Sequence, residues 1–342
     1  MQKKTKVAIV ILNWNGRGFL EQFLPSVTQY SNAENCKVIV ADNASTDDSL
    51  IFMEETYGNS IEIIVLDKNY GFAGGYNKAL EKVDSEYFVL LNSDVEVTEN
   101  WIEPIIKYMD TNPDVAACMP KILAYHAKET FEYAGAAGGF IDILGYPFCR
   151  GRIFETVEKD EDQYNDTRDI FWATGACMFV QAELFKKLGG FDEDFFAHME
   201  EIDLCWRLKN SGYRISYISD SVVYHVGGGT LPQGNPWKTF LNFRNSLFML
   251  YKNLPPQKVH LRVFRRLCMD MISAMRFLIG FKFKDFAAIF KAHIAFYKKK
   301  SSMREKRITN RSNGLNHSEM YRRNVVWQYY LKRKKTFLKL NF

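Results

Sequence analysis

The sequence has few cysteines and no long apolar run. Its six cysteines are scattered and none forms a C-x-x-C pair, which excludes a zinc site of that type and a disulfide framework and indicates a reducing compartment. No stretch reaches the ~18 apolar residues that a bilayer-spanning helix needs. The apolar run Val7–Leu12 is too short for the core of a secretory signal, so none is expected.

Acidic residues are scarce towards the end of the chain. Residues 257–342 hold 22 Lys and Arg against 4 Asp and Glu, a net charge of +18. Residues 1–256 hold 23 against 36, a net charge of −13. The overall charge of +5 therefore combines an acidic front with a basic tail, which predicts two different roles. With 342 residues and 47% apolar content, the chain can bury the core of one large or two medium domains.

Short β-branched runs alternate with helical segments in the first hundred residues. Such runs predict buried strands, and a helix is expected after each of the first three. The strands are expected at Val7–Leu12, Cys36–Ala41, Ile61–Leu66 and Tyr87–Leu91. This alternation predicts an α/β fold, a mostly parallel sheet flanked by helices, in which ligands bind at the carboxyl ends of the strands.

Three polar turns, at 42–47, 69–77 and 92–94, follow these strands. Asp42 can contact a ligand or simply shape the start of a helix. The glycines of the second turn do not match G-x-G-x-x-G, but they would let a ligand approach the backbone closely. Asp94, at a strand exit, is well placed to hold a hydrated divalent cation, although a turn-forming Asp is the commoner case.

The chain is organised around residues 170–230, where two acidic groups occur within twelve residues, at 192–194 and 200–203. Acids at a helix start are favoured by the helix dipole, which would explain some of them. Large apolar residues alternate with these acids, however, and a partly dry pocket would raise a carboxyl pKa towards the range of a general base. His225, before a glycine turn at 227–229, is a candidate second metal ligand, although a lone His is usually structural.

The section between these parts is harder to interpret. A helix is expected at Trp101–Met109 and a strand at Val115–Met119. An irregular glycine-rich section, Gly135–Gly151, and an acidic loop, Glu155–Asp169, follow them. We assign no chemistry to these two segments and expect loops.

The basic tail contains two amphipathic helices, expected at 264–279 and 286–297. Such helices lie in a membrane interface and are attracted to anionic lipid. The alternative is that their apolar side packs on the rest of the protein. A nucleic-acid surface is not expected, because no reading motif accompanies the charge.

Seven segments in order resemble family 2 glycosyltransferases, in particular the rhamnosyltransferase-like branch of bacterial surface-polysaccharide assembly. They are VAIVILNWNG, VIVADNASTDDS, NYGFAGGYNKAL, LLNSDVEV, GACMFV, FDEDFFAHMEEIDLCWRL and YHVGGG, between about residues 5 and 250. The resemblance implies a GT-A fold, a Rossmann-like α/β sheet, and an inverting mechanism. It also implies a nucleotide-diphosphate-sugar donor and Mg²⁺ or Mn²⁺ as cofactor.

The resemblance also implies roles for single residues. Glu201 stands where the family has its base, an Asp in a Glu-Asp-x-Asp motif, and Glu200 is the alternative base. Asp94 would bind the metal with His225 beside it, and Asn92 would contact the ribose. The nucleotide site would comprise Asn13, Asp42 at the base, Asn69, Gly71, Gly74, Asn77, Asn92 and Asp94. The acceptor side would include Trp172, Gly175 and Asp203.

These expectations define the hypothesis. Residues 1–255 would form the catalytic domain, with a nucleotide-binding half at 1–98 and an acceptor half at 99–255. Residues 256–342 would form a helical tail that holds the enzyme peripherally on the cytoplasmic face of the cell membrane. The acceptor would be a glycan or a lipid-linked sugar. A sugar nucleotidyltransferase and a non-catalytic nucleotide- or glycan-binding module are the alternatives, and the sequence does not give the oligomeric state.

Overall fold

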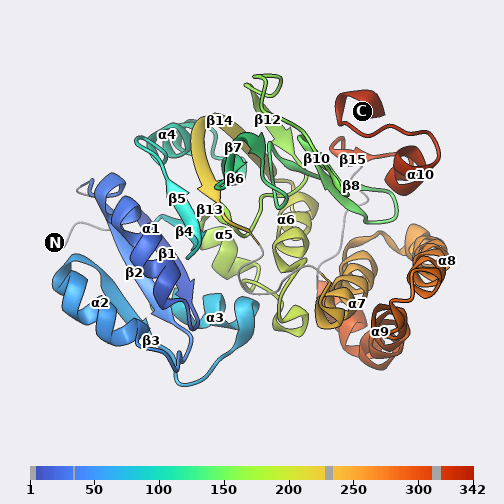
Figure 1. Ribbon diagram of the computed structural model, residues 1–342, viewed down its shortest axis with the longest axis horizontal. Helices are drawn as coiled ribbons and strands as arrows, with labels where there is room; N and C mark the ends of the chain where they lie inside the picture. Colours follow the sequence, from blue (N-terminus) through green and yellow to red (C-terminus); the bar gives the residue numbers. More distant parts are fainter. Residues whose placement is uncertain (1–4, 34, 228–233, 310–316) are drawn as a thin grey trace.

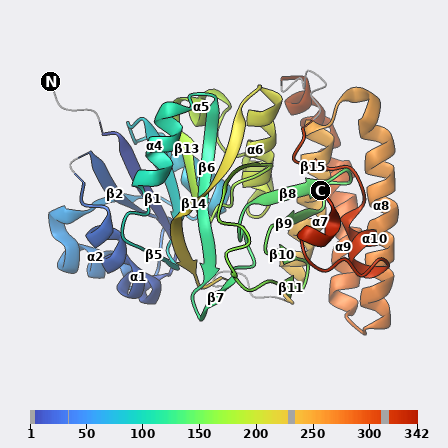
Figure 2. The same cartoon turned by 90° about the horizontal axis from the view of Figure 1, so that it is seen from above.

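The computed structural model describes residues 5–33, 35–227, 234–309 and 317–342. Within them, a ten-stranded sheet forms the centre of the molecule and a five-stranded sheet lies beyond it. The molecule is elongated, with helix α2 near one end and helix α8 at the other (Figures 1 and 2). None of its described helices is both long and apolar enough to cross a bilayer.

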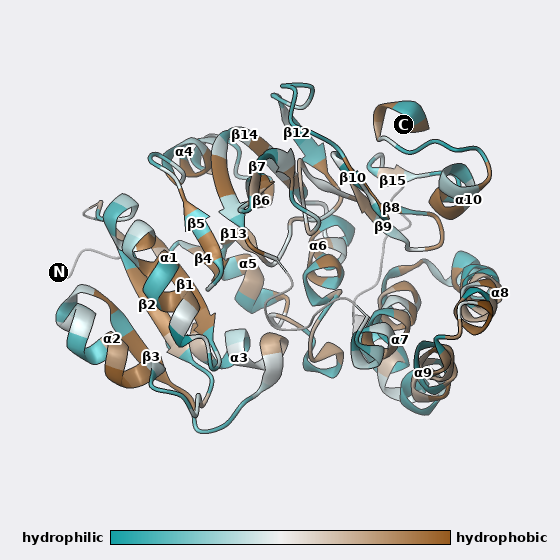
Figure 3. Cartoon of the chain, in the orientation of Figure 1, coloured by the Kyte–Doolittle hydropathy of each residue, from teal (hydrophilic) through white to brown (hydrophobic). Residues whose placement is uncertain are grey.

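The central sheet has strand order β12-β14-β6-β13-β4-β1-β2-β3, with β5 beside β14 and β7 beside β6. Its strands are β1 (Val7–Asn13), β2 (Cys36–Asp42), β3 (Glu62–Val65), β4 (Tyr87–Asn92), β5 (Val95–Val97), β6 (Val115–Ala124), β7 (Ala127–Phe131), β12 (Thr167–Ile170), β13 (Cys177–Gln181) and β14 (Arg214–His225). The four strands expected in the first hundred residues are all present. Strands β1 and β2 are largely brown in Figure 3 because most of their side chains are apolar and buried.

The two halves of this sheet differ. Strands β1, β2, β3 and β4 are parallel throughout. Strand β13 then enters antiparallel between β4 and β6, and β12 and β5 pair antiparallel with β14. The α/β fold class is confirmed, but only the first half is parallel throughout. In the second half β14 pairs in parallel with β6, and the remaining pairings are antiparallel, which the repeat of strand and helix did not predict.

Ten α-helices and three 3-10 turns accompany the sheets in the described residues. The helices are α1 (Arg17–Tyr30), α2 (Ser49–Tyr57), α3 (Gly71–Leu80), α4 (Glu103–Thr111), α5 (Ala182–Lys187), α6 (Glu200–Asn210), α7 (Pro236–Asn253), α8 (Pro256–Ile279), α9 (Phe283–Thr309) and α10 (Val325–Tyr330). The 3-10 turns are η1 (Gly58–Ser60), η2 (Glu193–Phe195) and η3 (Leu338–Leu340).

The section expected to consist of loops builds the second sheet. Its strands are β8 (Gly139–Asp142), β9 (Pro147–Cys149), β10 (Arg152–Ile153), β11 (Thr156–Val157) and β15 (Met320–Tyr321). Strand β15, from the tail, pairs in parallel with β8. The loop expectation for 135–151 was therefore wrong, because these short strands are completed by a partner far away in the sequence. The tail is joined to the rest of the chain through this strand, and the division at residue 255 stays a prediction.

The tail helices have two different environments. Helix α9 packs on α7, where Phe296 lies against Phe248 and Tyr251. Helix α8 lies at the end of the molecule (Figure 1), and several of its apolar side chains are exposed. The alternative that part of the tail packs on the protein is thus correct for α9.

Candidate active site

The carboxyl end of the parallel strands is built from interlocked polar turns. Asn13, at the end of β1, donates from Nδ2 to Asp42 Oδ1 at 3.1 Å, and the backbone N–H of Ser45 donates to Asp42 Oδ2 at 2.9 Å. Asp42 is fully buried and both of its oxygens are engaged, so its contact with a base stays a prediction. The Oδ1 atom of Asn13 is buried without a partner, which leaves an acceptor for a ligand.

The second turn is held by Asn43, which follows β2 directly. Asn43 Nδ2 donates to Asn69 Oδ1 and to the carbonyl of Gly71, each at 3.1 Å, and Asn43 Oδ1 accepts from the backbone N–H of Tyr70. Asn69 Oδ1 also accepts from the N–H of Gly71. The predicted nucleotide residue Asn69 therefore holds the start of α3 in place.

Other parts of the protein fill the space beside the glycines of this turn, so their backbone is not open to a ligand. Gly71 has φ +71°, and a Cβ there would lie 2.7 Å from the ring of Phe196. A Cβ at Gly74 would lie 3.1 Å from Tyr70 Cβ and 3.7 Å from the carboxyl carbon of Glu193. The expectation that both give a ligand access to the backbone is not supported in this conformation, because the loop before α6 occupies that space.

Asn77 likewise binds protein. Its Nδ2 donates to the carbonyl of Phe191 at 2.8 Å, and its Oδ1 accepts from the N–H of Phe191 at 2.9 Å. A further, longer bond joins Nδ2 to Glu193. Asn77 thus anchors the chain between α5 and η2, and its predicted polar contact to the nucleotide would need these bonds to open.

Asp94 and His225 lie side by side. Asp94 follows β4, and His225 ends β14, which pairs with β5 at this point. Asp94 Oδ1 is 3.1 Å from His225 Nε2, and Asn92 Nδ2 is 3.4 Å from the same nitrogen. Asp94 and His225 are 7% and 4% exposed. Three predicted site residues from distant parts of the sequence therefore meet here.

Glu132 completes this group and was missed in the sequence, where no motif marks it. Its Oε2 lies 3.4 Å from His225 Nδ1, on the side of the ring away from Asp94. Burial lowers the pKa of His225, but the two carboxylates outweigh it and raise this pKa to about 10. Most of the predicted glycine turn after His225 lies outside the described residues.

The pair has the spacing for a divalent cation, and binding one would require His225 to lose the proton that its raised pKa keeps on the ring. Two neighbouring ligands of an octahedral Mg²⁺, each at 2.0–2.1 Å from the ion, lie about 3 Å apart. The 3.1 Å between Asp94 Oδ1 and His225 Nε2 matches that spacing. The described residues contain no group of three or more His, Cys, Asp or Glu side chains that could hold a metal alone. The remaining ligands would have to come from diphosphate oxygens and water.

The loop before α6 is strained and sets the position of two glutamates. Phe196, His198 and Met199 have φ values of +65°, +70° and +74°, a region that non-glycine residues rarely adopt. Glu200 and Glu201 follow in the first turn of α6. Their Oε2 atoms, and Nε2 of His198, are buried without partners. Unpartnered buried polar atoms are rare, and three within four residues indicate space for a polar ligand.

Burial sets the protonation of this pair. It raises the pKa of Glu201 to about 7, although Glu201 also accepts backbone N–H groups that favour its ionised form. Burial, with the neighbouring charge of Glu201, raises the pKa of Glu200 further. The rise expected from the apolar flanks is therefore found, and Glu201 is the carboxyl that ionises first.

Asn245 of α7 holds the strained loop. Its Nδ2 lies 2.9 Å, 2.9 Å and 2.8 Å from the carbonyl oxygens of Phe195, Ala197 and His198, and it is fully buried. Arg244 adds bonds to the carbonyls of Asp194 and Phe195, so it faces neither a phosphate nor open solvent. A single Asn inside a helix carries no sequence signal for such a role.

The loop reaches the same edge of the sheet as the Asp94 pair. The backbone N–H groups of Phe72 and Ala73, at the start of α3, donate to the carbonyl of Phe196. A Cβ at Gly175 would lie 3.2 Å from the ring of Phe72, and the neighbouring Ala176 accepts from the N–H of Asn92. A short series of contacts thus connects the loop before Glu201 to the strand end that carries Asp94.

Two residues expected on the acceptor side are buried and engaged. Trp172 is 3% exposed and donates from Nε1 to the carbonyl of Phe140. Asp203 is fully buried and accepts from Arg207, Lys252 and Asn253. Neither is free to contact a sugar in this structure, because their polar atoms hold neighbouring elements together.

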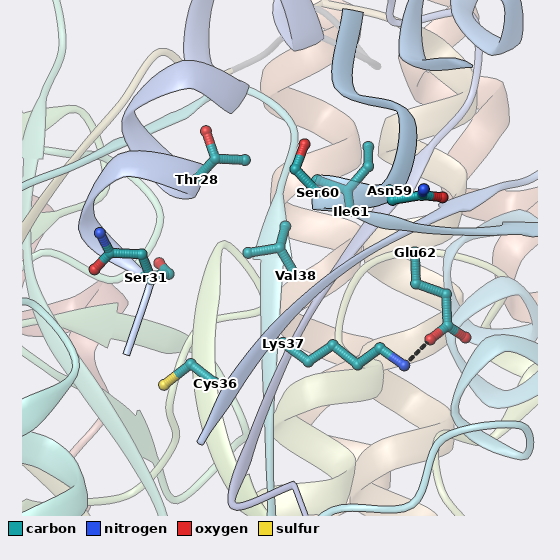
Figure 4. A pocket seen from close by; sticks show the side chains of 10 residues that line it. Thr28, Ser31, Cys36, Lys37, Val38, Asn59, Ser60, Ile61 and Glu62 are labelled. Atoms are coloured by element: carbon teal, nitrogen blue, oxygen red, sulfur yellow. Dashed lines mark ion pairs between the residues drawn. The ribbon is translucent and has the colours of Figure 1, made fainter. Parts of the chain in front are cut away.

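A hollow of about 520 Å³ lies elsewhere (Figure 4). It opens at the amino ends of β2 and β3, opposite to the edge that carries the acids. It is lined by the end of α1 and by Lys37 and Glu62, which form an ion pair. This hollow contains none of the predicted site residues.

Comparison with known proteins decides the family. Residues 8–189, more than half of the chain, match Glycosyl transferase family 2. The chain belongs to this family. Among curated relatives, it is 25% identical over 235 residues to N-acetylglucosaminyl-diphospho-decaprenol L-rhamnosyltransferase of Mycobacterium tuberculosis, which covers 64% of this chain and 75% of the relative. It is 26% identical to rhamnosyltransferase WbbL of Escherichia coli, over 62% of this chain and 80% of the relative. These matches support the rhamnosyltransferase-like branch.

Solved structures support the GT-A fold. The structure of S. aureus TarS residues 1–349 with UDP-GlcNAc matches with a TM-score of 0.56 at 15% identity, over 93% of this chain and 99% of that one. GalNAc-T7 with UDP, GalNAc and Mn²⁺ matches with a TM-score of 0.57 at 14% identity, over 74% of this chain. The match spans about half, 48%, of the length of the GalNAc-T7 chain.

Proposed function

We propose that this glycosyltransferase moves a sugar, with inversion, from a nucleotide-diphosphate-sugar to a glycan or lipid-linked acceptor in cell-surface polysaccharide synthesis. One observation carries the proposal. Asp94 pairs with His225 at one edge of the sheet, and the loop before Glu201, whose carboxyl has a raised pKa, is connected to the same edge. The names of the relatives favour dTDP-rhamnose as donor, and a UDP-sugar is the alternative.

Glu201 is proposed as the general base. With a pKa of about 7 it is ionised in part of the molecules at neutral pH and can take the proton of the acceptor hydroxyl. That oxygen attacks the anomeric carbon, the new glycosidic bond forms, and the bond to the diphosphate breaks with its electron pair leaving on the diphosphate oxygen. Burial and the charge of Glu201 also raise the pKa of Glu200, and we propose that the proton shared by the two carboxyls resides on Glu200.

Asp94 and His225 are proposed to hold Mg²⁺ or Mn²⁺, with Asn92 beside them. Two neighbours, GalNAc-T7 and the Pyrobaculum calidifontis mannosyltransferase PcManGT, have structures with Mn²⁺. A bound divalent cation would offset the negative charge that develops on the leaving diphosphate. Asn13, with its free buried Oδ1, is proposed to contact the nucleotide.

The test is an assay of the full chain with Mg²⁺ or Mn²⁺, dTDP-rhamnose or UDP-sugars, and an N-acetylglucosaminyl-diphospho-lipid acceptor. Release of nucleoside diphosphate with a new glycosidic bond of inverted configuration is expected. Retained configuration would contradict the mechanism. Pyrophosphate formation from a nucleoside triphosphate and a sugar phosphate would identify a nucleotidyltransferase, and nucleotide binding without turnover in every combination would indicate a binding module.

A further inference from the structure

Helix α8 exposes large apolar side chains to solvent. The exposed apolar side chains along it fall on one stripe, spaced three or four residues apart, with exposed Arg265 and Arg276 at its border. Its members, here called the α8 stripe, are Leu261, Phe264, Cys268, Ile272, Met275 and Ile279. Five of them are large, and each of these is between 49% and 74% exposed. A helix that only packed on its own protein would turn this stripe inwards.

The side of α8 that faces the protein buries Val259, Val263 and Ala274 together with an ion pair. Arg266 donates from Nε to Asp270 Oδ1 at 2.7 Å, and the two residues are 3% and 0% exposed. Arg266 also donates to the carbonyl of Leu144, while Asp270 contacts Tyr146 and His293. Turning the helix over would leave this buried pair without partners, which is costly, so the outward direction of the stripe is fixed by the fold.

The turn between α8 and α9 continues this apolar surface. Phe281 is 81% exposed and Phe283 is 59% exposed, and exposed Lys282 and Lys284 alternate with them. Phe281 has φ +56°, so the chain reverses sharply there and the two rings lie at the tip of the helical hairpin. Exposed aromatic and basic residues in this arrangement are typical of segments that lie in a membrane interface.

The charge around the stripe is mostly positive, although exposed Glu155 pairs with Arg276 beside it. Between residues 256 and 304 the acids are Asp270 and Asp285, and both are buried. The exposed bases of this segment are Lys258, Arg265, Arg276, Lys282, Lys284, Lys291, Lys298, Lys299 and Arg304. A second copy of the chain would bring two such basic borders together, which like charges oppose. An anionic lipid surface is complementary to this border.

We propose that the α8 stripe and the Phe281–Lys284 turn dock on an anionic membrane, with the apolar side chains at the boundary between headgroups and acyl chains. The protein would then be held peripherally on the cytoplasmic leaflet, where anionic lipids are found. Its opposite end, which carries α2, would point away from the lipid (Figures 1 and 2). This inference depends on the surface and its charge, not on the proposed reaction.

The test is co-sedimentation of the full chain with phosphatidylcholine vesicles, with and without phosphatidylglycerol. The double variant Phe264→Ser/Ile272→Ser removes apolar contacts, and Lys282→Glu/Lys284→Glu reverses charge at the turn. Ile51→Ser is the matched control, because Ile51 on α2 is 59% exposed at the other end of the molecule. All of these side chains are exposed, so each variant is expected to fold, which circular dichroism checks.

The wild type and Ile51→Ser are expected to bind phosphatidylglycerol vesicles equally. Each double variant should bind them roughly tenfold more weakly or worse. Added salt should weaken wild-type binding, because it screens the basic border. Equal binding by all four proteins, or no binding by the wild type, would overturn the proposal. So would a wild-type dimer that Phe264→Ser/Ile272→Ser separates without any vesicle binding, since a second copy would then cover the stripe.

Discussion

Two groups of acids in one short stretch have opposite surroundings. Asp192 and Asp194 are paired with lysines: Lys252 of α7 reaches Asp192, and Lys299 and Lys306 of α9 reach Asp194. Burial raises the pKa of Asp192, but Lys252 and Lys306 lower it to about 2. Among the described residues, none of the ion pairs involves Glu200 or Glu201, and burial leaves their pKa values raised.

The difference separates acids that build the fold from acids that can react. Salt-bridged carboxylates stay ionised and hold α7 and α9 against η2, whereas a carboxyl without a cation in a dry pocket can exchange a proton near neutral pH. Asp203 belongs with the first group although it follows Glu201 by two residues, because Arg207 and Lys252 bind it. The following predictions test this division.

Asp203→Asn should produce the largest loss of stability. The change leaves Arg207 without its carboxylate in a buried site, so the free energy of unfolding should fall by roughly 3–5 kcal/mol. Urea denaturation measures it. Asp220→Asn, at an exposed Asp on β14, is the control and should stay within about 0.5 kcal/mol of the wild type. A loss of less than ~1 kcal/mol in Asp203→Asn would remove Asp203 from the structural group.

Asn245→Ala should affect both stability and turnover. It removes the donor that three loop carbonyls share, which should cost about 1–3 kcal/mol. If Asn245 positions Glu201, kcat per folded molecule should fall roughly tenfold or more while KM for the donor changes little. Unchanged kcat in the folded fraction would give Asn245 a purely structural role.

Glu201→Gln should make the protein more stable at pH 8. In the wild type the pKa of Glu201 is about 7 in the folded protein and near 4.5 in the unfolded chain. The protonated carboxyl therefore favours folding, and the stability of the protein falls as pH rises between these two values. The neutral amide avoids this loss, which should amount to about 3 kcal/mol at pH 8 and vanish near pH 4. Thermal unfolding at the two pH values measures it, and an equal or lower stability at pH 8 would contradict the raised pKa.

Lys306→Ala should have the smallest effect. Its ammonium bridges Asp192 and Asp194 from α9, but it is about one-third exposed and Lys252 still pairs with Asp192. A loss of about 1 kcal/mol or less is expected in urea denaturation. A loss as large as that of Asp203→Asn would show that the tail, not α7, supplies the main neutralising charge.

The parallel strands β1 to β4 could be predicted from the sequence because each strand is a short local run of buried β-branched residues followed by a polar turn. The strands of the second sheet could not, since β8 depends on β15, which lies almost 180 residues further along. Asp94 and His225 were predicted as candidate metal ligands because of their places at strand ends. Glu132 and Asn245 were not predicted, because single residues in a strand or helix carry no local pattern.

For helix α8 the amphipathic pattern was predicted but its direction was not. Periodicity shows that one side is apolar, and it does not show which side meets the protein. The buried pair Arg266–Asp270 decides the direction, and its partners come from the second sheet and from α9. Likewise, Gly71 and Gly74 were expected to let a ligand approach the backbone closely. In the structure, Phe196 and Glu193 lie in the space beside these glycines.

The most direct test of the account measures sugar transfer and nucleotide binding together in Glu201→Gln. Glu183→Gln is the matched control, because Glu183 is also a first-turn glutamate, on α5 at the opposite edge of the sheet. At pH 7.5 the account predicts a transfer rate lowered by roughly a thousandfold in Glu201→Gln with the Kd for the nucleoside diphosphate and metal unchanged, and no effect in Glu183→Gln. Full transfer activity in Glu201→Gln would contradict it.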